Sequence, residues 1–202
     1  MKLLLVVGNG KIGRKLISEI EAVDHPDIHI ILDSSSSIKR VIKLIRRGTL
    51  SLPLVFKMFF ADFMRTDYKT AKYHQIFSND DLLNILQDTK PNNVVLFRAG
   101  LIINKRIIDT GIPLFNVHCL KLPEYGGLGQ LMRALNNKDY EQCATCHHVT
   151  QSIDDGDIIA THPFQLDGQK SYKQNEDIAY DAGIKLIQNL LDTKLLTKIN
   201  VK

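Results

Sequence analysis

The sequence predicts an α/β fold in which a mostly parallel sheet carries helices on both faces. Short apolar runs of strand length alternate with segments whose apolar residues recur at helical spacing through the first two-thirds of the chain. Glycine or polar residues directly follow several of these runs. In such sheets ligands bind beyond the carboxyl ends of the strands, so these residues are candidates for a site.

The length of 202 residues suits one sizeable domain. Hydrophobic residues make up 44% of the chain, which is enough for a buried core and argues against global disorder. We expect a catalytic domain over residues 1–165 and a helical C-terminal extension over 166–202 that packs on the same domain.

The first elements follow from the apolar pattern. Residues 2–7 form an apolar run that ends at a glycine, which is typical of a buried parallel strand. Apolar residues recur at helical spacing over 12–20, and a second strand is expected at 28–32. A run of serines can then cap a basic helix at about 38–47.

Later elements are bounded by capping and breaking residues. Ser78 and the acidic residues after it open a helix that Pro91 ends. The remaining pattern predicts strands and helices in this order: strand 94–97, helix 104–109, strand 112–117, helix 128–136, strands 143–150 and 157–165, and helix 175–192.

Two features of residues 38–63 leave alternatives open. The net charge of +4 is concentrated in one basic cluster: Lys39, Arg40, Lys43, Arg46 and Arg47. Such a cluster suits either a phosphate-bearing partner or the solvated face of a helix, and we favour the solvated face. A phenylalanine cluster follows, which suits either the core or a partner-binding surface, and we predict core: Phe56, Phe59, Phe60 and Phe63.

Residues 8–13 read G-N-G-K-I-G directly after the first strand, and Asp33 ends the second. This is the context of a dinucleotide-binding fingerprint, in which helix amides hold a phosphate and the acid binds ribose hydroxyls. It would predict an NAD(P)-binding oxidoreductase. The alternative is a tight strand-to-helix turn without dinucleotide.

The cysteines and the N-terminal run suggest a reduced, cytoplasmic protein. Residues 143–147 match the C-x-x-C-H pattern of haem attachment, but in a strand residues three apart face opposite sides, so we expect no metal or haem. No apolar run approaches the ~20 residues of a membrane span, and the first run is too short for a signal peptide. We therefore expect a cytoplasmic chain without a membrane partner.

The most informative residues are Asn116 and His118, with Asp154 and Asp155 following 36 and 37 residues after the histidine. An amide can donate to a developing oxyanion, an imidazole can move a proton, and a carboxylate can orient the imidazole and raise its pKa. This combination suits acyl transfer. His147, on the strand before Asp154, is expected to line the same cleft, whereas His148 should face away.

Three linked blocks carry a family resemblance. Residues 116–118 read N-V-H, residues 120–127 read L-K-L-P-E-Y-G-G, and residues 154–158 read D-D-G-D-I. They resemble the N-x-H, S-L-L-P-x-Y-R-G and D-x-G-x-I blocks of the formyltransferases that use N10-formyltetrahydrofolate. The resemblance implies a Rossmann-like formyltransferase fold, N10-formyltetrahydrofolate as formyl donor, and Asn116, His118 and Asp154 as catalytic residues.

The resemblance also implies two binding sets and no metal. The donor would contact Phe97, Arg98, Ala99, Gly100, Leu101, Ile102, Val149 and Ile153. The acceptor would contact Gly8, Asn9, Gly10, Lys11, Tyr125 and Gly127.

Departures from the family pattern guide the choice of acceptor. Gly126 replaces the usual arginine, Cys119 replaces a proline, and Lys11-Ile12 stands where glycinamide ribonucleotide enzymes carry Ser-Asn. From the chain length we also expect no tRNA-binding domain of the kind that methionyl-tRNA enzymes carry.

We therefore expect formyl transfer to a nucleotide-linked amino sugar, such as dTDP-4-amino-4,6-dideoxyglucose. Glycinamide ribonucleotide formyltransferase and a non-catalytic folate- or nucleotide-binding relative remain alternatives. The expected partner is a small molecule and not a nucleic acid, and a homodimer is left open.

Overall fold

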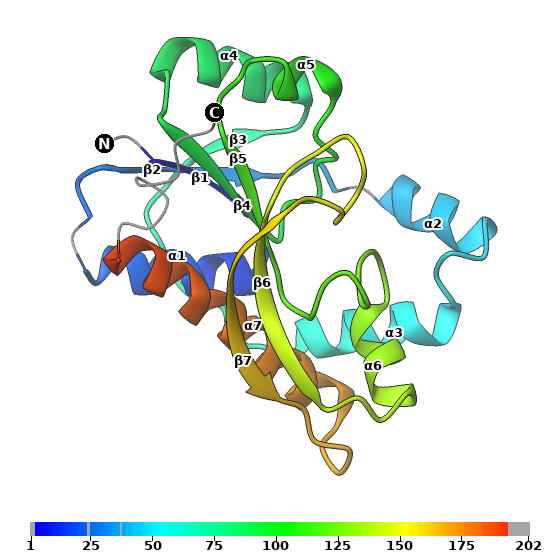
Figure 1. Cartoon of the computed structure of the whole chain (residues 1–202). Coiled ribbons are helices and arrows are strands. Elements are labelled where there is room, and N and C mark those ends of the chain that lie inside the picture. Colours follow the sequence, from blue (N-terminus) through cyan, green and yellow to red (C-terminus); the bar gives the residue numbers. More distant parts are fainter. Residues whose placement is uncertain (1–2, 24, 37, 194–202) are drawn as a thin grey trace.

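A seven-stranded sheet forms the centre of the protein, seen in a computed structural model that describes residues 3–23, 25–36 and 38–193, with backbone alone at 38–40. Its strand order is β3-β2-β1-β4-β5-β6-β7 (Figure 1). The first five strands pair in parallel, and β6 and β7 pair antiparallel. The strands are β1 (Leu3–Gly8), β2 (Ile28–Asp33), β3 (His74–Ile76), β4 (Asn93–Phe97), β5 (Leu114–His118), β6 (Glu141–His148) and β7 (Ile158–Gln165).

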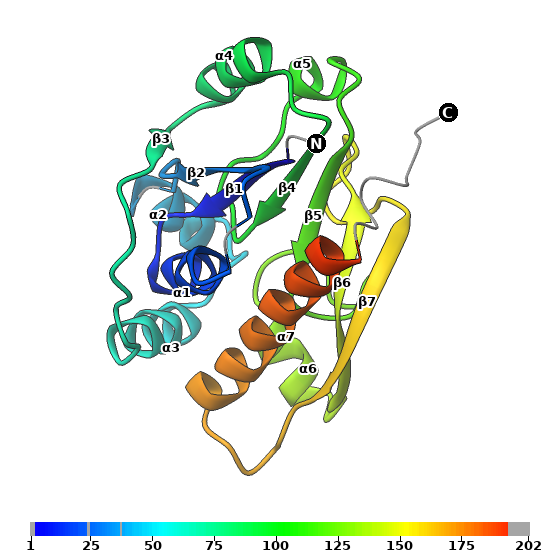
Figure 2. The same ribbon diagram turned by 90° about the vertical axis from the view of Figure 1, so that its left-hand side faces the viewer.

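Helices cover both faces of this sheet, as Figure 2 shows, so the predicted α/β fold is confirmed. Helices α1 and α7 lie on one face, and α4 and α5 lie on the other. The helices are α1 (Lys11–Glu21), α2 (Ile38–Arg46), α3 (Leu52–Phe63), α4 (Asn79–Thr89), α5 (Lys105–Ile108), α6 (Gln130–Asn136) and α7 (Tyr172–Asp192).

The core is divided by the sheet because successive side chains of a strand point to opposite faces. Leu5 and Val7 of β1 belong to the cluster beside α1 and α7, whereas Leu4 and Val6 belong to the cluster on the other face. All four are fully buried. This burial on both faces explains why β1 has no polar alternation.

The parallel register brings three residues to one edge of the sheet. Val7 lies opposite Phe97, and Phe97 lies opposite Val117. The next residues along these strands are Gly8, Arg98 and His118. A Cβ atom on Gly8 would lie 2.2 Å from the Arg98 carbonyl oxygen, so only glycine allows this approach. The expected site edge therefore forms at the carboxyl ends of β1, β4 and β5.

The prediction that the phenylalanine cluster belongs to the core is wrong. These residues form the outer face of α3, where their side chains are 62–72% exposed: Phe56, Phe59, Phe60 and Phe63. The buried face of α3 instead presents Leu54 and Ala61. The spacing of the phenylalanines does not tell whether the apolar face of the helix points toward the core or toward solvent.

The last helix begins earlier than the apolar pattern predicted, at Tyr172 rather than near 175. Ser171 and Gln174 form a capping box at its start. The fully buried Asn175 side chain also accepts from Asp167 N–H and donates to the Asp167 carbonyl, both at 2.8 Å. These polar contacts fix the turn from β7 into α7. Residue 2 of the first expected strand and residues 194–202 of the expected extension lie outside the described residues.

Candidate active site

Strand β5 supplies the first two polar side chains of the candidate site. Asn116 and His118 are two residues apart, so their side chains leave the same face of the sheet. Asn116 lies opposite His147 of the antiparallel neighbour β6, and its amide Nδ2 is 3.1 Å from His147 Nε2. The structure thus brings His147 into the site, as its place on the strand before Asp154 predicted.

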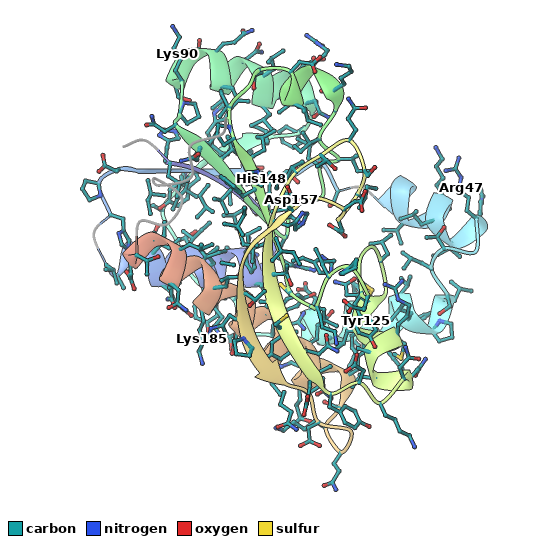
Figure 3. All side chains as sticks on the ribbon, in the orientation of Figure 1. Arg47, Lys90, Tyr125, His148, Asp157 and Lys185 are labelled. Atoms are coloured by element: carbon teal, nitrogen blue, oxygen red, sulfur yellow. The ribbon has the colours of Figure 1, made fainter. Side chains whose placement is uncertain are left out.

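Asp154 reaches these residues from the loop between β6 and β7. The base of the loop is closed where His148 N–H donates to the Asp157 carbonyl at 2.9 Å (Figure 3). Asp154 adopts a positive φ of 55°, and its Oδ2 accepts from Gly127 N–H at 2.8 Å. The carboxylate lies between the two histidines, 3.6 Å from His118 Nδ1 and 3.6 Å from His147 Nε2.

The hydrogen bonds assign protons to both histidines. His118 Nε2 is 2.8 Å from the Tyr125 carbonyl, which can only accept, so Nε2 carries a proton and Nδ1 faces Asp154. His147 Nδ1 likewise donates to the His148 carbonyl at 2.8 Å. The other ring nitrogen of His147, Nε2, lies against the Asn116 amide nitrogen. This contact holds Asn116 with its nitrogen toward the histidine.

Burial and charge act in opposite directions on the pKa of His118. Burial lowers it, the Asp154 carboxylate and the Tyr125 carbonyl raise it, and the net result is a pKa below the ordinary value. For Asp154, burial alone would raise the pKa, but His147, His118 and Gly127 N–H lower it to about 2. At neutral pH the resting site therefore pairs a neutral imidazole with a carboxylate.

Gly126 and Arg133 shape the loop that faces Asp154. A Cβ on Gly126 would lie 3.3 Å from Asp154 Cβ, so the glycine found in place of the family arginine permits close packing here. The Arg133 guanidinium of α6 donates to the carbonyls of Gly126, at 2.5 Å, and Leu128, at 3.3 Å. The sequence analysis did not find Arg133, because no motif predicts a helix side chain that bonds to the carbonyls of the residues just before its own helix.

A cavity of about 420 Å³ lies beside the glycine loop, at the start of α1. Its lining includes Gly8, Gly10, Asp33, Asp62 and Arg98. The first turn of α1 has no side-chain cap, which leaves backbone N–H groups available to an anion.

Asp33 does not offer the free carboxylate that a dinucleotide site needs. It is buried, and its two oxygens accept from Ser35 N–H and Leu101 N–H, both at 2.8 Å. The carboxylate therefore ties the loop after β2 to the loop after β4. The geometry favours the alternative interpretation of residues 8–13, which is a tight strand-to-helix turn without dinucleotide.

The residues expected to bind the acceptor divide into two groups. Gly8, Gly10 and Lys11 line the cavity, but the Lys11 ammonium donates to the carbonyls of Phe63 and Arg65 at 3.0 and 2.9 Å. Asn9 lines it too, with its amide donating to Ser34 Oγ at 2.9 Å.

The other two expected acceptor residues, Tyr125 and Gly127, lie beside His118 and Asp154. The Tyr125 hydroxyl is turned away, donating to Asp139 at 2.9 Å, and only its carbonyl meets His118. Gly127 contacts Asp154 through its N–H. Tyr125 therefore acts on the site through its backbone, not as a side chain that meets an acceptor.

The residues expected to bind the donor are similarly divided. The Phe97 side chain is fully buried in the core, so it cannot face a ligand, and the Arg98 guanidinium lies 4.4 Å from the centre of the Tyr180 ring. Ile102 and Ile153 are exposed. The remaining four are partly buried: Ala99, Gly100, Leu101 and Val149.

The two cysteines on β6 are not part of a cluster of metal-ligating side chains in the described part of the chain. Cys146 is buried in the core and Cys143 is partly buried, and both are free thiols. Across residues 3–23, 25–36 and 38–193, no group of three or more His, Cys, Asp or Glu side chains is placed to hold a metal ion.

Comparison with known families agrees with this geometry. The model of the Formyl transferase family matches residues 3–190, which is most of the chain. The chain belongs to this family. The match includes β5, the β6–β7 loop and the glycine loop.

Individual relatives are distant. Methionyl-tRNA formyltransferase of Fervidobacterium nodosum is 27% identical over 113 residues, which cover 56% of this chain and 36% of that protein. The enzyme of the same name from Finegoldia magna is 28% identical over 116 residues, with 57% and 37% covered. The chain thus spans little more than a third of the length of these curated relatives.

Solved structures share the fold at low identity. Phosphoribosylglycinamide formyltransferase from Anaplasma phagocytophilum superposes with a TM-score of 0.70 at 12% identity, covering 100% of this chain and 89% of the other. A candidate sugar N-formyltransferase from Mycobacterium tuberculosis gives 0.67 at 15%, covering 98% and 69%. These similarities support the fold and do not distinguish acceptors.

Proposed function

We propose that this chain is an enzyme that transfers the formyl group of N10-formyltetrahydrofolate to the amine of a nucleotide-linked amino sugar, such as dTDP-4-amino-4,6-dideoxyglucose. The observation that carries formyl transfer is the convergence of Asn116, His118 and Asp154 at one edge of the sheet. The Asp154 carboxylate lies 3.6 Å from the His118 imidazole and 3.6 Å from His147, and His147 in turn contacts the Asn116 amide at 3.1 Å. Membership of the formyl transferase family supports the same chemistry.

In this mechanism the acceptor amine attacks the formyl carbon, and negative charge develops on the formyl oxygen. Asn116 donates to that oxygen from an amide whose orientation His147 holds. The lowered pKa of His118 makes the neutral imidazole its resting form. His118 therefore begins as the base, taking the amine proton on Nδ1.

Asp154 makes that proton transfer favourable. Its carboxylate stays ionised because its pKa is about 2, and it lies 3.6 Å from His118 Nδ1. The imidazolium that forms is stabilised by this charge. When the carbon–N10 bond of the folate breaks, the imidazolium returns the proton to the leaving nitrogen, which restores the neutral histidine.

The cavity at the glycine loop is the proposed site for the phosphates of the acceptor. Backbone N–H groups at the start of α1 suit an anion there. Gly8 and His118 end strands separated by β4, so their backbones are two strand spacings apart, about 10 Å. This separation suits an acceptor whose phosphate and reacting amine lie at opposite ends of a sugar.

The test incubates the purified protein with N10-formyltetrahydrofolate and dTDP-4-amino-4,6-dideoxyglucose and follows product mass. A gain of one formyl group that His118→Asn abolishes and Asp155→Asn retains supports the proposal. dTDP-glucose, which has no amine, is the matched acceptor control. Formate release without formylated product would instead indicate hydrolysis of the folate, and no turnover of any kind would contradict the catalytic assignment.

Glycinamide ribonucleotide is the second candidate acceptor. The observation that favours it is the cavity at the start of α1, whose uncapped backbone N–H groups suit a ribonucleotide monophosphate as well as a nucleotide sugar. Competition between the two acceptors in one reaction decides between them. Preferential formylation of glycinamide ribonucleotide would replace the sugar as the proposed substrate.

A further inference from the structure

Helix α3 presents its apolar face to solvent. Its exposed stripe recurs at intervals of four, three, one and three residues, which places the five side chains on one side of a helix: Leu52, Phe56, Phe59, Phe60 and Phe63. Each is 58–72% exposed. A contiguous patch of this kind is unusual on a soluble monomer and marks an interaction surface.

The outward orientation of α3 is fixed by anchors at both ends. Ser51 caps its first turn by accepting from Leu54 N–H at 3.4 Å. Past its last turn, the Lys11 ammonium binds the carbonyls of Phe63 and Arg65. Arg65 is in turn buried and paired with Glu176 of α7. These contacts leave the aromatic stripe no route into the core without breaking buried polar pairs.

The surface around the stripe is basic. Residues 34–63, up to the end of α3, contain six Lys or Arg residues and a single acid, Asp62. Among the described side chains of this segment, Lys43, Arg46, Arg47 and Lys57 are exposed. Helices α2 and α3 lie next to each other at one side of the molecule (Figure 1), and Arg47 projects from its outer edge (Figure 3).

We propose that α2 and α3 form a surface that binds an anionic phospholipid bilayer. Phenylalanine rings can enter the boundary between headgroups and acyl chains, and the surrounding cations can contact lipid phosphates. No helix in the described part of the chain could cross a bilayer, and peripheral binding of this kind requires none. The proposal departs from the expectation of no membrane partner, which considered only spanning segments.

Charge decides between a bilayer and a second copy of the chain as the occupant. A two-fold dimer through the stripe would place the same basic segment on both sides of the interface. The exposed cations Lys43, Arg46, Arg47 and Lys57 would then face their own copies, and like charges repel. A negatively charged bilayer satisfies the apolar stripe and the cations together.

The same surface borders the proposed acceptor site. Asp62 of α3 lines the glycine-loop cavity, so binding through α3 would hold this cavity close to the lipid surface. The inference is independent of the proposed reaction, because it rests on the exposure of α3 and the charge of α2.

Vesicle co-sedimentation tests the proposal directly. We expect the wild-type chain to bind vesicles that contain phosphatidylglycerol and to bind pure phosphatidylcholine vesicles at least tenfold more weakly. Raising the salt concentration should weaken the binding, because it screens the cations. No binding to the anionic vesicles at low salt would overturn the proposal.

Paired variants separate the two parts of the surface. Phe56→Ser with Phe60→Ser should weaken binding to anionic vesicles at least tenfold, because it removes inserted apolar area. The control Phe77→Ser changes another exposed phenylalanine, 62% exposed at the end of β3, and should bind like wild type. Equal loss in both would show that the α3 stripe has no special role.

Charge variants complete the test. Replacing Lys43, Arg46 and Arg47 by Gln should remove the preference for anionic vesicles, whereas replacing the exposed lysines 72, 90 and 185 by Gln should keep it. Thermal unfolding checks that each variant stays folded. A stable dimer in solution that Phe56→Ser with Phe60→Ser dissociates, without vesicle binding by the wild type, would assign the surface to self-association and overturn the lipid proposal.

Discussion

Two buried charged clusters in this protein differ in how closely their groups approach. In the cluster below α3, Arg65 lies 2.5 Å from Glu176 and 2.7 Å from Asp177. At the edge of β5, Asp154 is 3.6 Å from each of His118 and His147. Both clusters contain side chains that are almost completely removed from solvent.

The difference separates a structural cluster from one that can exchange a proton. Glu176 also accepts hydrogen bonds from Tyr172 at 3.1 Å and from Tyr180 at 2.9 Å, so its charge is fully partnered. Burial would lower the pKa of Arg65, but Glu176 and Asp177 raise it above its ordinary value, so the ion pair is permanent. His118, by contrast, keeps an unprotonated nitrogen beside Asp154, and its charge can change during a reaction.

The largest expected effect is the loss of activity in His118→Asn. The substitution removes the proposed base, and we expect kcat to fall by about 10²–10⁴-fold. Stability should fall by about 1–2 kcal/mol, because the buried Tyr125 carbonyl loses its contact with His118 Nε2. Formylation assays and thermal unfolding measure the two quantities. His74→Asn, at an exposed position on β3, is the control, and near-normal turnover in His118→Asn would contradict the catalytic assignment.

Arg65→Met should show the reverse behaviour, with a large loss of stability. The change leaves the buried Glu176 without its cation, and breaking such a pair costs about 3–5 kcal/mol. Urea unfolding measures the loss. The control Arg106→Met breaks a surface pair with Asp80 and should cost less than about 1 kcal/mol. Similar values for the two variants would mean that the α3 cluster is not a structural anchor.

Sequence patterns predicted much of the candidate site, because side-chain direction follows from the strand period. Asn116 and His118 share a face for the reason that residues two apart in a strand always do. Glycine and proline signals bounded the strands around them. The resemblance to the family blocks predicted that Asp154, from another part of the chain, lies at the same edge.

The structural cluster and the α3 surface could not be found in this way. Arg65 meets Glu176 across 111 residues, and no local pattern reports such a pair. The phenylalanine stripe has the spacing of a core helix, and this spacing is the same whether the apolar face is buried or exposed. The role of Asp33 was also open in the sequence. A carboxylate at the end of a strand can bind ribose hydroxyls or accept from two backbone N–H groups, and both cases have the same sequence pattern.

Asp154→Asn should reveal the pH dependence of the looser cluster. The folded pKa of Asp154, about 2, lies below its ordinary value of 3.8, so the carboxylate stabilises the fold above pH 4. This stabilisation, about 2 kcal/mol, is lost as the pH falls through 2. Urea unfolding between pH 5 and 2.5 should therefore show a steeper decline in wild type than in Asp154→Asn. Asp155→Asn is the matched control and should decline like wild type; the opposite order would move the acid to Asp155.

Gly126→Ala should give the smallest effect and measure how much movement the looser cluster tolerates. The added Cβ would lie 3.3 Å from Asp154 Cβ, so the loop must give by a few tenths of an ångström, and the carboxylate would shift relative to His118. We expect kcat to fall by less than about tenfold and stability to change by less than about 1 kcal/mol. The control Gly111→Ala has no heavy atom near its new Cβ but a positive φ of 72°, so it should cost stability without changing kcat. If kcat is unchanged in Gly126→Ala, the rate does not depend on small changes in the distance between Asp154 and His118. If kcat falls as far as in His118→Asn, the reaction tolerates no increase in this distance beyond 3.6 Å.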